Sequence, residues 1–192
     1  MINSIQFIGY HGTKGDYARR ICLERCFNPS TSSSEWLGKG IYFFKEDKIQ
    51  AYLFARYRHN EDVSVLSVDI GTDNYIDMSV TEDRNEVESY LSLLLNLYKN
   101  KASSDYKDLI NRHPELQNGL TDTLIDGLIL DLIYEIKPFD LVVCPFDVPG
   151  KKKNKWFRFK ATQIQVCVKD NSCIDYDSLK EVDENELKKI LP

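Results

Sequence analysis

The sequence contains no stretch of about 18 uninterrupted apolar residues, so no segment of it is expected to cross a membrane as a helix. Its N-terminus lacks the basic start and apolar run of a secretory signal, and we expect a cytoplasmic location. Positive charge is not in excess either, since 25 Lys and Arg residues against 30 Asp and Glu residues give a net charge of −5. Binding to nucleic acid through bulk electrostatics is therefore not expected, although a local basic site stays open.

Clustered metal ligands are also missing. Cys22 and Cys26 are four residues apart, but no second Cys or His pair with ligand spacing follows them, and the 3 histidines are scattered. The 5 cysteines are odd in number, and most of them lie in apolar or alternating segments. We therefore expect buried, unpaired thiols in a reducing compartment, and no metal site.

The remaining composition is that of a globular protein. Apolar residues make up 42% of the 192 residues and charged residues 29%, and no internal repeat or low-complexity segment interrupts them. A chain of this length and composition fits a single domain, 1–192, with enough apolar residues for a core.

Apolar periodicity predicts the elements of this domain. Strands are expected at 5–10, 41–44, 63–70, 141–146, 156–159 and 163–168. Helices are expected at 16–26 with Asp16 as the cap, 46–58, 82–98, a short stretch before Pro114, 121–136 and 183–190. Strands near both ends with helices between them indicate an α+β domain around antiparallel strands, with a helical insert at 80–137 and a helical C-terminal tail at 176–192.

Two short segments contain residues suited to chemistry. Segment 10–13 reads Tyr-His-Gly-Thr, so His11 ends a predicted strand and Gly12 allows a ligand to approach the backbone closely. Segment 36–43 reads Trp-Leu-Gly-Lys-Gly-Ile-Tyr-Phe and leads from a loop into a strand. Gly-x-Gly alone is weak evidence for nucleotide binding, and this stretch lacks the Rossmann and phosphate-loop spacings.

Together, YHGT and the LGKGIYF found about thirty residues later resemble the first two signature segments of the His-Tyr-Glu class of ADP-ribosyltransferases. This is the poly(ADP-ribose) polymerase-like and diphtheria-toxin-like branch. The resemblance implies a split antiparallel β-core with inserted and flanking helices, and NAD as co-substrate. It further implies that His11 binds ribose hydroxyls, that the Gly12 backbone binds the nicotinamide amide, and that Tyr42 and Tyr52 stack on the two faces of the nicotinamide. Thr13 and Gly40 complete the expected NAD contacts.

The third signature of that class is a Glu on a late strand, and here the matching segment 160–168 contains neither Glu nor Asp. Gln163 and Gln165 lie two residues apart on one face of the predicted strand, and Gln165 is the preferred equivalent. A glutamine accepts a hydrogen bond from ribose but cannot act as a general base, so a single transfer is expected rather than chain elongation. An acid from a loop stays open as a substitute, the candidates being Asp69, Asp77, Asp140 and Asp147.

The resulting prediction is an NAD-dependent mono-ADP-ribosyltransferase with His11, Tyr42, Gln165 and Gln163 as catalytic candidates. The acceptor would be a protein or a nucleic acid, and the resemblance suits a toxin or defence effector with or without an antitoxin partner. The basic, aromatic segment 151–160 is either a solvated loop or an acceptor-binding loop. Two other classes stay open, an NAD glycohydrolase and a catalytically inactive module that binds NAD or ADP-ribose. Removal of a 2′-phosphate from RNA is more distant, because it requires further basic residues around the site.

Overall fold

The structure is a computed structural model that describes residues 4–32, 35–60, 62–119, 121–147 and 162–188. The strand expected at 156–159 and the basic segment 151–160 lie outside these described residues.

Seven strands form one sheet in the order β4-β5-β6-β2-β1-β3-β7. Their bounds are β1 (Ile5–Lys14), β2 (Ile41–Lys45), β3 (Val63–Thr72), β4 (Tyr75–Asp77), β5 (Leu141–Asp147), β6 (Thr162–Val168) and β7 (Ile174–Glu181). All neighbours are antiparallel except β4 and β5, which are parallel. The prediction of an α+β fold around antiparallel strands is confirmed.

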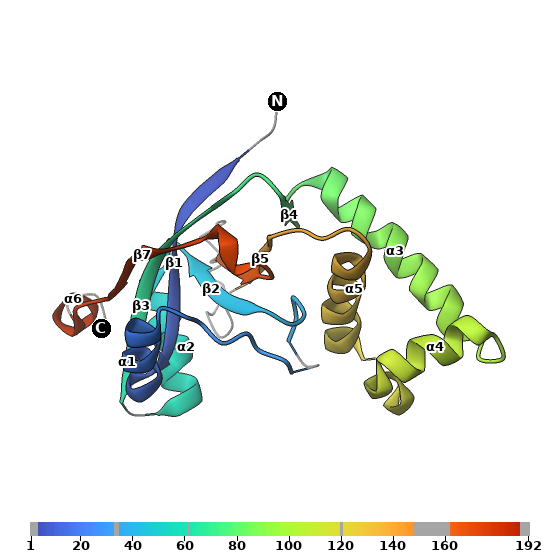
Figure 1. The fold of residues 1–192 in the computed structure, drawn as a ribbon, viewed down its shortest axis with the longest axis horizontal. Coiled ribbons are helices and arrows are strands. Elements are labelled where there is room, and N and C mark those ends of the chain that lie inside the picture. The colour runs from blue at the N-terminus through green and yellow to red at the C-terminus, as the bar shows by residue number, and fades with distance from the viewer. Residues whose placement is uncertain (1–3, 33–34, 61, 120, 148–161, 189–192) are drawn as a thin grey trace, which may run out of the picture.

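The helices are α1 (Gly15–Glu24), α2 (Lys48–His59), α3 (Thr81–Lys99), α4 (Ser104–Arg112), α5 (Asp122–Ile136) and α6 (Glu184–Lys188), with short 3-10 turns at Pro114–Asn118 and Asn171–Cys173. The helical character predicted for 80–137 is confirmed. Figure 1 shows α3 and α4 extending away from the sheet beside α5.

Two predictions are wrong, one about the C-terminal segment and one about the cap of α1. The segment 176–192 is not a helical tail throughout, because in its described part, 176–188, the residues up to Glu181 belong to the edge strand β7 and α6 begins only at Glu184. The apolar alternation of β7 is short, because the register between β3 and β7 shifts between Asp175 and Lys180 and the period of two does not continue through the strand. Asp16 is not the cap of α1 either: the helix begins at Gly15, and Asp16 lies in its first turn, where it pairs with Arg19.

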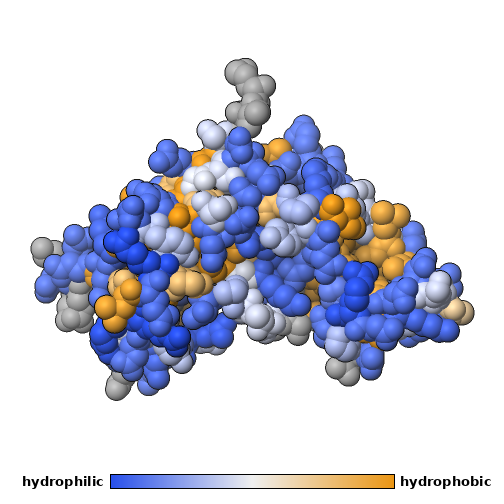
Figure 2. Space-filling view, viewed as in Figure 1, coloured by the Kyte–Doolittle hydropathy of each residue, from blue (hydrophilic) through white to orange (hydrophobic). Residues whose placement is uncertain are grey.

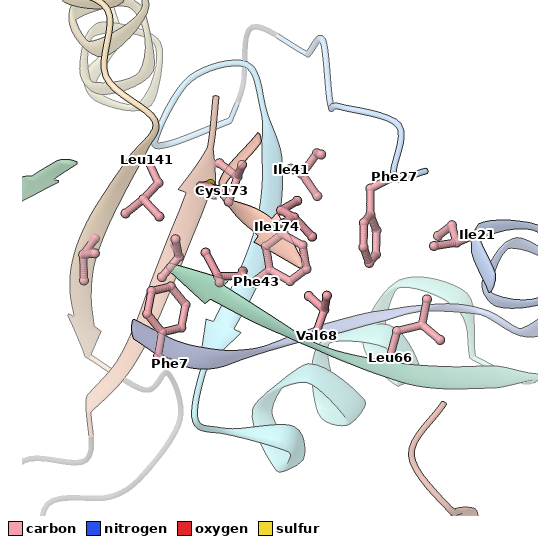
Figure 3. Packing of buried hydrophobic residues seen from close by; sticks show 14 of the residues in the cluster. Phe7, Ile21, Phe27, Ile41, Phe43, Leu66, Val68, Leu141, Cys173 and Ile174 are labelled. Carbon is pink, nitrogen blue, oxygen red and sulfur yellow. The ribbon is translucent and has the colours of Figure 1, made fainter. Parts of the chain in front are cut away.

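The sheet buries apolar side chains on both faces. On one face, which we call the α1 face, the side chains of Phe7, Phe43 and Val68 pack with Phe27 and with Ile21 of α1, as Figure 3 shows. On the other, the α2–α5 face, Phe44 and Val65 pack against Ala51 of α2, while Val142 and Cys167 pack against Ile133 of α5. Strand residues therefore alternate between the two faces, as the period of two requires.

The apolar stripe predicted along 121–136 is confirmed as core at Leu128, Ile129 and Ile133, whereas Ile136 at the end of α5 is 69% exposed. The surface in Figure 2 is mostly hydrophilic with small apolar groups. Within the described residues, no helix combines the length and apolar character that a membrane crossing requires.

Candidate functional site

The site begins where β1 and β2 separate, a place we call the strand fork. The two strands pair only through Gly9 with Lys45 and Tyr10 with Phe44, and they then diverge, as Figure 1 shows. The same register would bring Gly12 opposite Tyr42, but no ladder pair forms there. Beyond the fork, β1 continues only with β3 and β2 only with β6.

His11 holds the fork open. Its Nδ1 lies 2.8 Å from the carbonyl oxygen of Tyr42. Since a carbonyl oxygen only accepts, Nδ1 carries the proton, and the neutral ring presents Nε2 as an acceptor. The ring packs edge-on against Phe27 and Phe43 at centroid distances of 5.2 and 5.7 Å. Burial lowers the pKa of His11 below its ordinary value of 6.5, against a smaller opposing effect of the bond to Tyr42, so the ring is neutral at pH 7.

The backbone of Gly12 faces into the fork. The carbonyl oxygen of Ile8 accepts from the backbone N–H of Glu46 at 2.9 Å, so Ile8 points its backbone groups toward β2. In an antiparallel strand alternate residues point the same way, and the N–H and C=O of Gly12 therefore also point toward β2. The Tyr42 carbonyl that a continued ladder would pair with Gly12 is taken by His11 instead.

Gly12 is also required by packing. A Cβ on Gly12 would lie 1.9 Å from the carbonyl oxygen of Ala51, so the absent side chain lets α2 lie directly against β1. Close approach of the backbone to a ligand was the expected reason for this glycine. In the structure, the close approach of α2 to β1 is by itself enough to require a glycine at position 12.

Tyr42 lies on the α2–α5 face, opposite to the face of His11. Its hydroxyl donates to the carbonyl oxygen of Gly38 at 2.7 Å and accepts from the N–H of Leu37 at 3.0 Å. Burial, together with the nearby Cys167 and Glu35, raises the pKa of this hydroxyl well above its usual range, so it stays protonated. The structure thus joins His11 to the backbone of Tyr42 and uses the phenol to hold the segment before β2.

A buried ion pair holds the same segment. The Nζ of Lys169, whose side chain is 3% exposed, lies 2.7 Å from Oδ1 of Asp131 and donates to the carbonyl oxygens of Leu37 at 3.0 Å and Lys39 at 2.7 Å. Asp131 in turn accepts from the N–H of Lys39 at 2.9 Å. Gly38 has φ +76°, and a Cβ there would lie 2.2 Å from Oδ1 of Asp131, so only glycine fits. Neither charged partner carries a local sequence signal, because one is on α5 and the other follows β6.

The other predicted site residues are distributed around this centre. Gly40 exchanges backbone hydrogen bonds with Ser30 at the start of β2. Thr13 is buried on β1 opposite Ser64. Tyr52 packs with the cluster around Val65 and lines a groove of about 260 Å³ beside α6, whereas Tyr42 packs with the cluster that contains Ile133.

Gln163 and Gln165 lie on β6 opposite Phe146 and Cys144 of β5, and Gln165 is also opposite Phe44 of β2. Strand alternation places both amides on the α2–α5 face, the face of Tyr42. Gln163 is buried, at 9% exposed. The expected shared face of the two glutamines is confirmed, and their neighbours in the sheet are aromatic or thiol side chains.

All five cysteines are free, and the prediction that they are buried holds for Cys167 and Cys173 but is wrong for Cys26, which is exposed. Within the described residues no three His, Cys, Asp or Glu side chains form a group that could hold a metal ion. Burial raises the pKa of Cys144 to about 11 and of Cys167 and Cys173 to about 12.

We expect a native-state thiol titration to show one fast-reacting thiol, that of Cys26, because the thiolate is the reacting form and burial suppresses it elsewhere. At pH 7.4 a disulfide reagent should react rapidly with one thiol per chain. The remaining thiols should react only when the protein is unfolded. Cys26→Ser should abolish the fast phase. Persistence of that phase in Cys26→Ser would show that one of the other thiols is the fast-reacting one.

The chain is similar to an uncharacterized protein of Methanocaldococcus jannaschii, with 26% identity over 210 residues that cover 96% of this chain and 94% of the relative. No protein-family model matches the sequence, and no solved structure matches it. The similarity covers nearly the whole of both chains, so it is not confined to the two glycine-containing segments.

Proposed function

We propose that the protein is an NAD-dependent mono-ADP-ribosyltransferase with an ADP-ribosyltransferase-like fold. The observation that carries the proposal is the strand fork, where His11 keeps β1 and β2 apart and leaves the N–H and C=O of Gly12 directed into the opening. A primary carboxamide needs one acceptor and one donor side by side, which is what one residue's backbone offers. The nicotinamide of NAD carries such a group.

In this proposal His11 acts on the neighbouring ribose. Its Nε2 is an acceptor in the neutral ring and suits a hydroxyl of the ribose diol. The reaction would break the bond between nicotinamide and C1′ of the ribose, with the bonding electrons leaving on nicotinamide. An acceptor lone pair would form the new bond to C1′, so positioning and electrostatics supply most of the catalysis.

Two further parts of the proposal rest on the resemblance of the two sequence segments. One is a macromolecular acceptor, either a protein or a nucleic acid, and the other is a role as a cytoplasmic toxin or defence effector. A second candidate is an inactive module that binds NAD or ADP-ribose. It is favoured by β6, whose residues facing the α2–α5 face are Gln163, Gln165 and Cys167 rather than a carboxylate.

We expect the purified protein, incubated with NAD labelled in its adenylate part and with a cell lysate, to transfer label to a macromolecule. A Tyr42→Ala, His11→Ala variant should not. Protease or nuclease treatment then identifies the acceptor class. Free labelled ADP-ribose without any labelled macromolecule would indicate a glycohydrolase. Saturable NAD binding without turnover would contradict both enzyme activities and support the inactive binding module.

A further inference from the structure

The third signature segment, on β6, lacks the expected carboxylate. If the site is to stabilise positive charge, a carboxylate has to come from another part of the chain. The candidate aspartates lie in other parts of the sheet and its loops. Asp77 accepts from Ser79, and Asp140 binds Thr72 and Asn74. Asp69 lies on β3 opposite the backbone of Asp175 in the edge strand β7. Asp147 ends β5 opposite Thr162. None of these contacts involves the strand fork, whereas the segment before β2 borders it directly.

Glu35 lies in that segment, between α1 and β2. Its Oε1 accepts from Oγ of Ser30 at 2.8 Å, and Ser30 is fixed to Gly40 by two backbone hydrogen bonds of 2.7 and 3.0 Å. The Glu35 side chain is 21% exposed. Its carboxylate is therefore held at the start of β2 by a short and specific set of contacts, while part of it stays open to solvent.

The same carboxylate also lies near α2, the helix that packs on β1. Oε1 of Glu35 lies 3.9 Å from Nη2 of Arg58, in the last turn of α2. α2 is the helix whose Ala51 carbonyl lies against Gly12 of β1. Glu35 thus connects the segment in front of β2 with the helix that supports β1, and the strand fork is bounded by those two elements.

Glu35 is also close to Tyr42. The backbone carbonyl of Glu35 accepts from the N–H of Gly38 at 3.0 Å, and this turn places Leu37 and Gly38 on the Tyr42 hydroxyl. The negative charge of Glu35 contributes to the raised pKa of Tyr42, after the larger effects of burial and of Cys167. Both observations place the Glu35 carboxylate within electrostatic range of the Tyr42 hydroxyl, and Tyr42 belongs to β2, one of the two strands of the fork.

We propose that Glu35 supplies the carboxylate that β6 lacks, and this inference rests on the proposed function. Glu35 is the catalytic acid–base group that faces the nicotinamide ribose and stabilises positive charge as the C1′–N bond breaks. The bonding electrons leave with neutral nicotinamide, the acceptor nucleophile bonds to C1′, and the proton of the nucleophile passes to the Glu35 carboxylate. The glutamines of β6 then need only position the sugar.

A purely structural role for Glu35 makes a different prediction. If Glu35 only ties the segment before β2 to α2, removal of Arg58 should be as harmful as removal of the carboxylate. Arg58 is 55% exposed and its pair with Glu35 is long, so its loss should have little effect on the fold. Gln at position 35 keeps an acceptor for Ser30 and removes only the charge.

The test measures kcat and KM for release of labelled nicotinamide, the Kd of NAD by calorimetry, and thermal melting, on the full chain and four variants. We expect Glu35→Gln to lower kcat by at least about 100-fold with an unchanged Kd and melting temperature. Glu35→Asp, which keeps the charge, should be intermediate. Arg58→Met and Glu24→Gln, the latter from an exposed pair with Arg20, should retain the wild-type kcat.

If wild type releases nicotinamide and the Glu35→Gln variant has the same kcat, the assignment of Glu35 is overturned and the proposed function stays intact. The assignment is also overturned if Arg58→Met loses as much kcat as Glu35→Gln, because the contact rather than the carboxylate is then required. A wild-type protein that binds NAD but releases no nicotinamide overturns the proposed enzyme, and the inference with it.

Discussion

Lys169→Met is expected to lower the melting temperature by about 10 °C, the largest stability loss among the substitutions proposed for this protein. The change leaves the carboxylate of Asp131, 17% exposed, without its cation, and removes the donor to the carbonyl oxygens of Leu37 and Lys39. Breaking a buried ion pair in this way costs about 3–5 kcal/mol, and 1 kcal/mol corresponds to roughly 2–4 °C in a domain of this size. The measurement is thermal unfolding followed by circular dichroism.

Lys137→Met is the matched control. Lys137 makes an ion pair of similar length with Glu86, 2.8 Å against 2.7 Å, but its side chain is 67% exposed. Exposed pairs contribute about 0–1 kcal/mol, so this variant should melt close to wild type. The double variant Lys169→Met, Asp131→Asn should recover part of the loss, because no unpaired charge then remains. Equal melting of the Lys169 and Lys137 variants would show that the buried pair does not hold the segment before β2.

Most regular elements can be predicted from the sequence because their signal is local. The helices α2 to α5 and the strands β1, β2, β3, β5 and β6 each carry an apolar period within a single short segment. β4 escapes prediction, because its three residues are too few to show a period. β7 escapes it because a register shift against β3 interrupts its period of two after a few residues.

The arrangement of the site is not predictable in the same way, because it depends on strand register. The resemblance implies that His11 and Tyr42 both contact NAD, but it does not fix how the two side chains lie relative to the sheet. Pairing of Tyr10 with Phe44 puts the side chain of His11 on one face of the sheet and that of Tyr42 on the other. A shift of one residue would have reversed this relation. Register is a long-range property that neither segment contains.

The ionised groups around the segment before β2 escape prediction for a related reason. Asp131 and Lys169 come from α5 and the end of β6, and Glu35 meets Arg58 of α2. Each of these residues, taken alone, has the composition of an ordinary helix surface or loop. Only the fold shows that the partners converge on one turn, so the sequence predicts where NAD-type motifs lie but not what holds them in place.

We expect His11→Asn to lower NAD turnover strongly while keeping the fold, which is the largest expected effect on activity. The amide of Asn can donate to the Tyr42 carbonyl in place of Nδ1, so the strand fork should survive. It offers no group at the position of Nε2. Loss of one hydrogen-bonding group aimed at the reacting substrate lowers kcat by roughly 100- to 1,000-fold. His11→Ala loses both functions and should also melt earlier.

The pH dependence provides an independent readout of the same residue. Because burial lowers the pKa of His11 below 6.5, the imidazole is neutral above pH 6.5 and its Nε2 remains an acceptor. We expect kcat/KM in wild type to be independent of His11 ionisation above pH 6.5 and to fall at lower pH as Nε2 takes a proton. Stability should follow the same direction, since the unfolded chain binds the proton first and folding weakens as the pH drops below 6.5.

The control for both experiments is His59→Asn, at the end of α2, which should match wild type in turnover and in pH profile. The decisive comparison is between His11→Asn and His11→Ala in activity and melting temperature. If His11→Ala turns over NAD at the wild-type rate, neither nitrogen of the ring contributes to catalysis. The strand fork would then be a feature of the fold alone, and the ADP-ribosyltransferase proposal would lose the observation on which it stands.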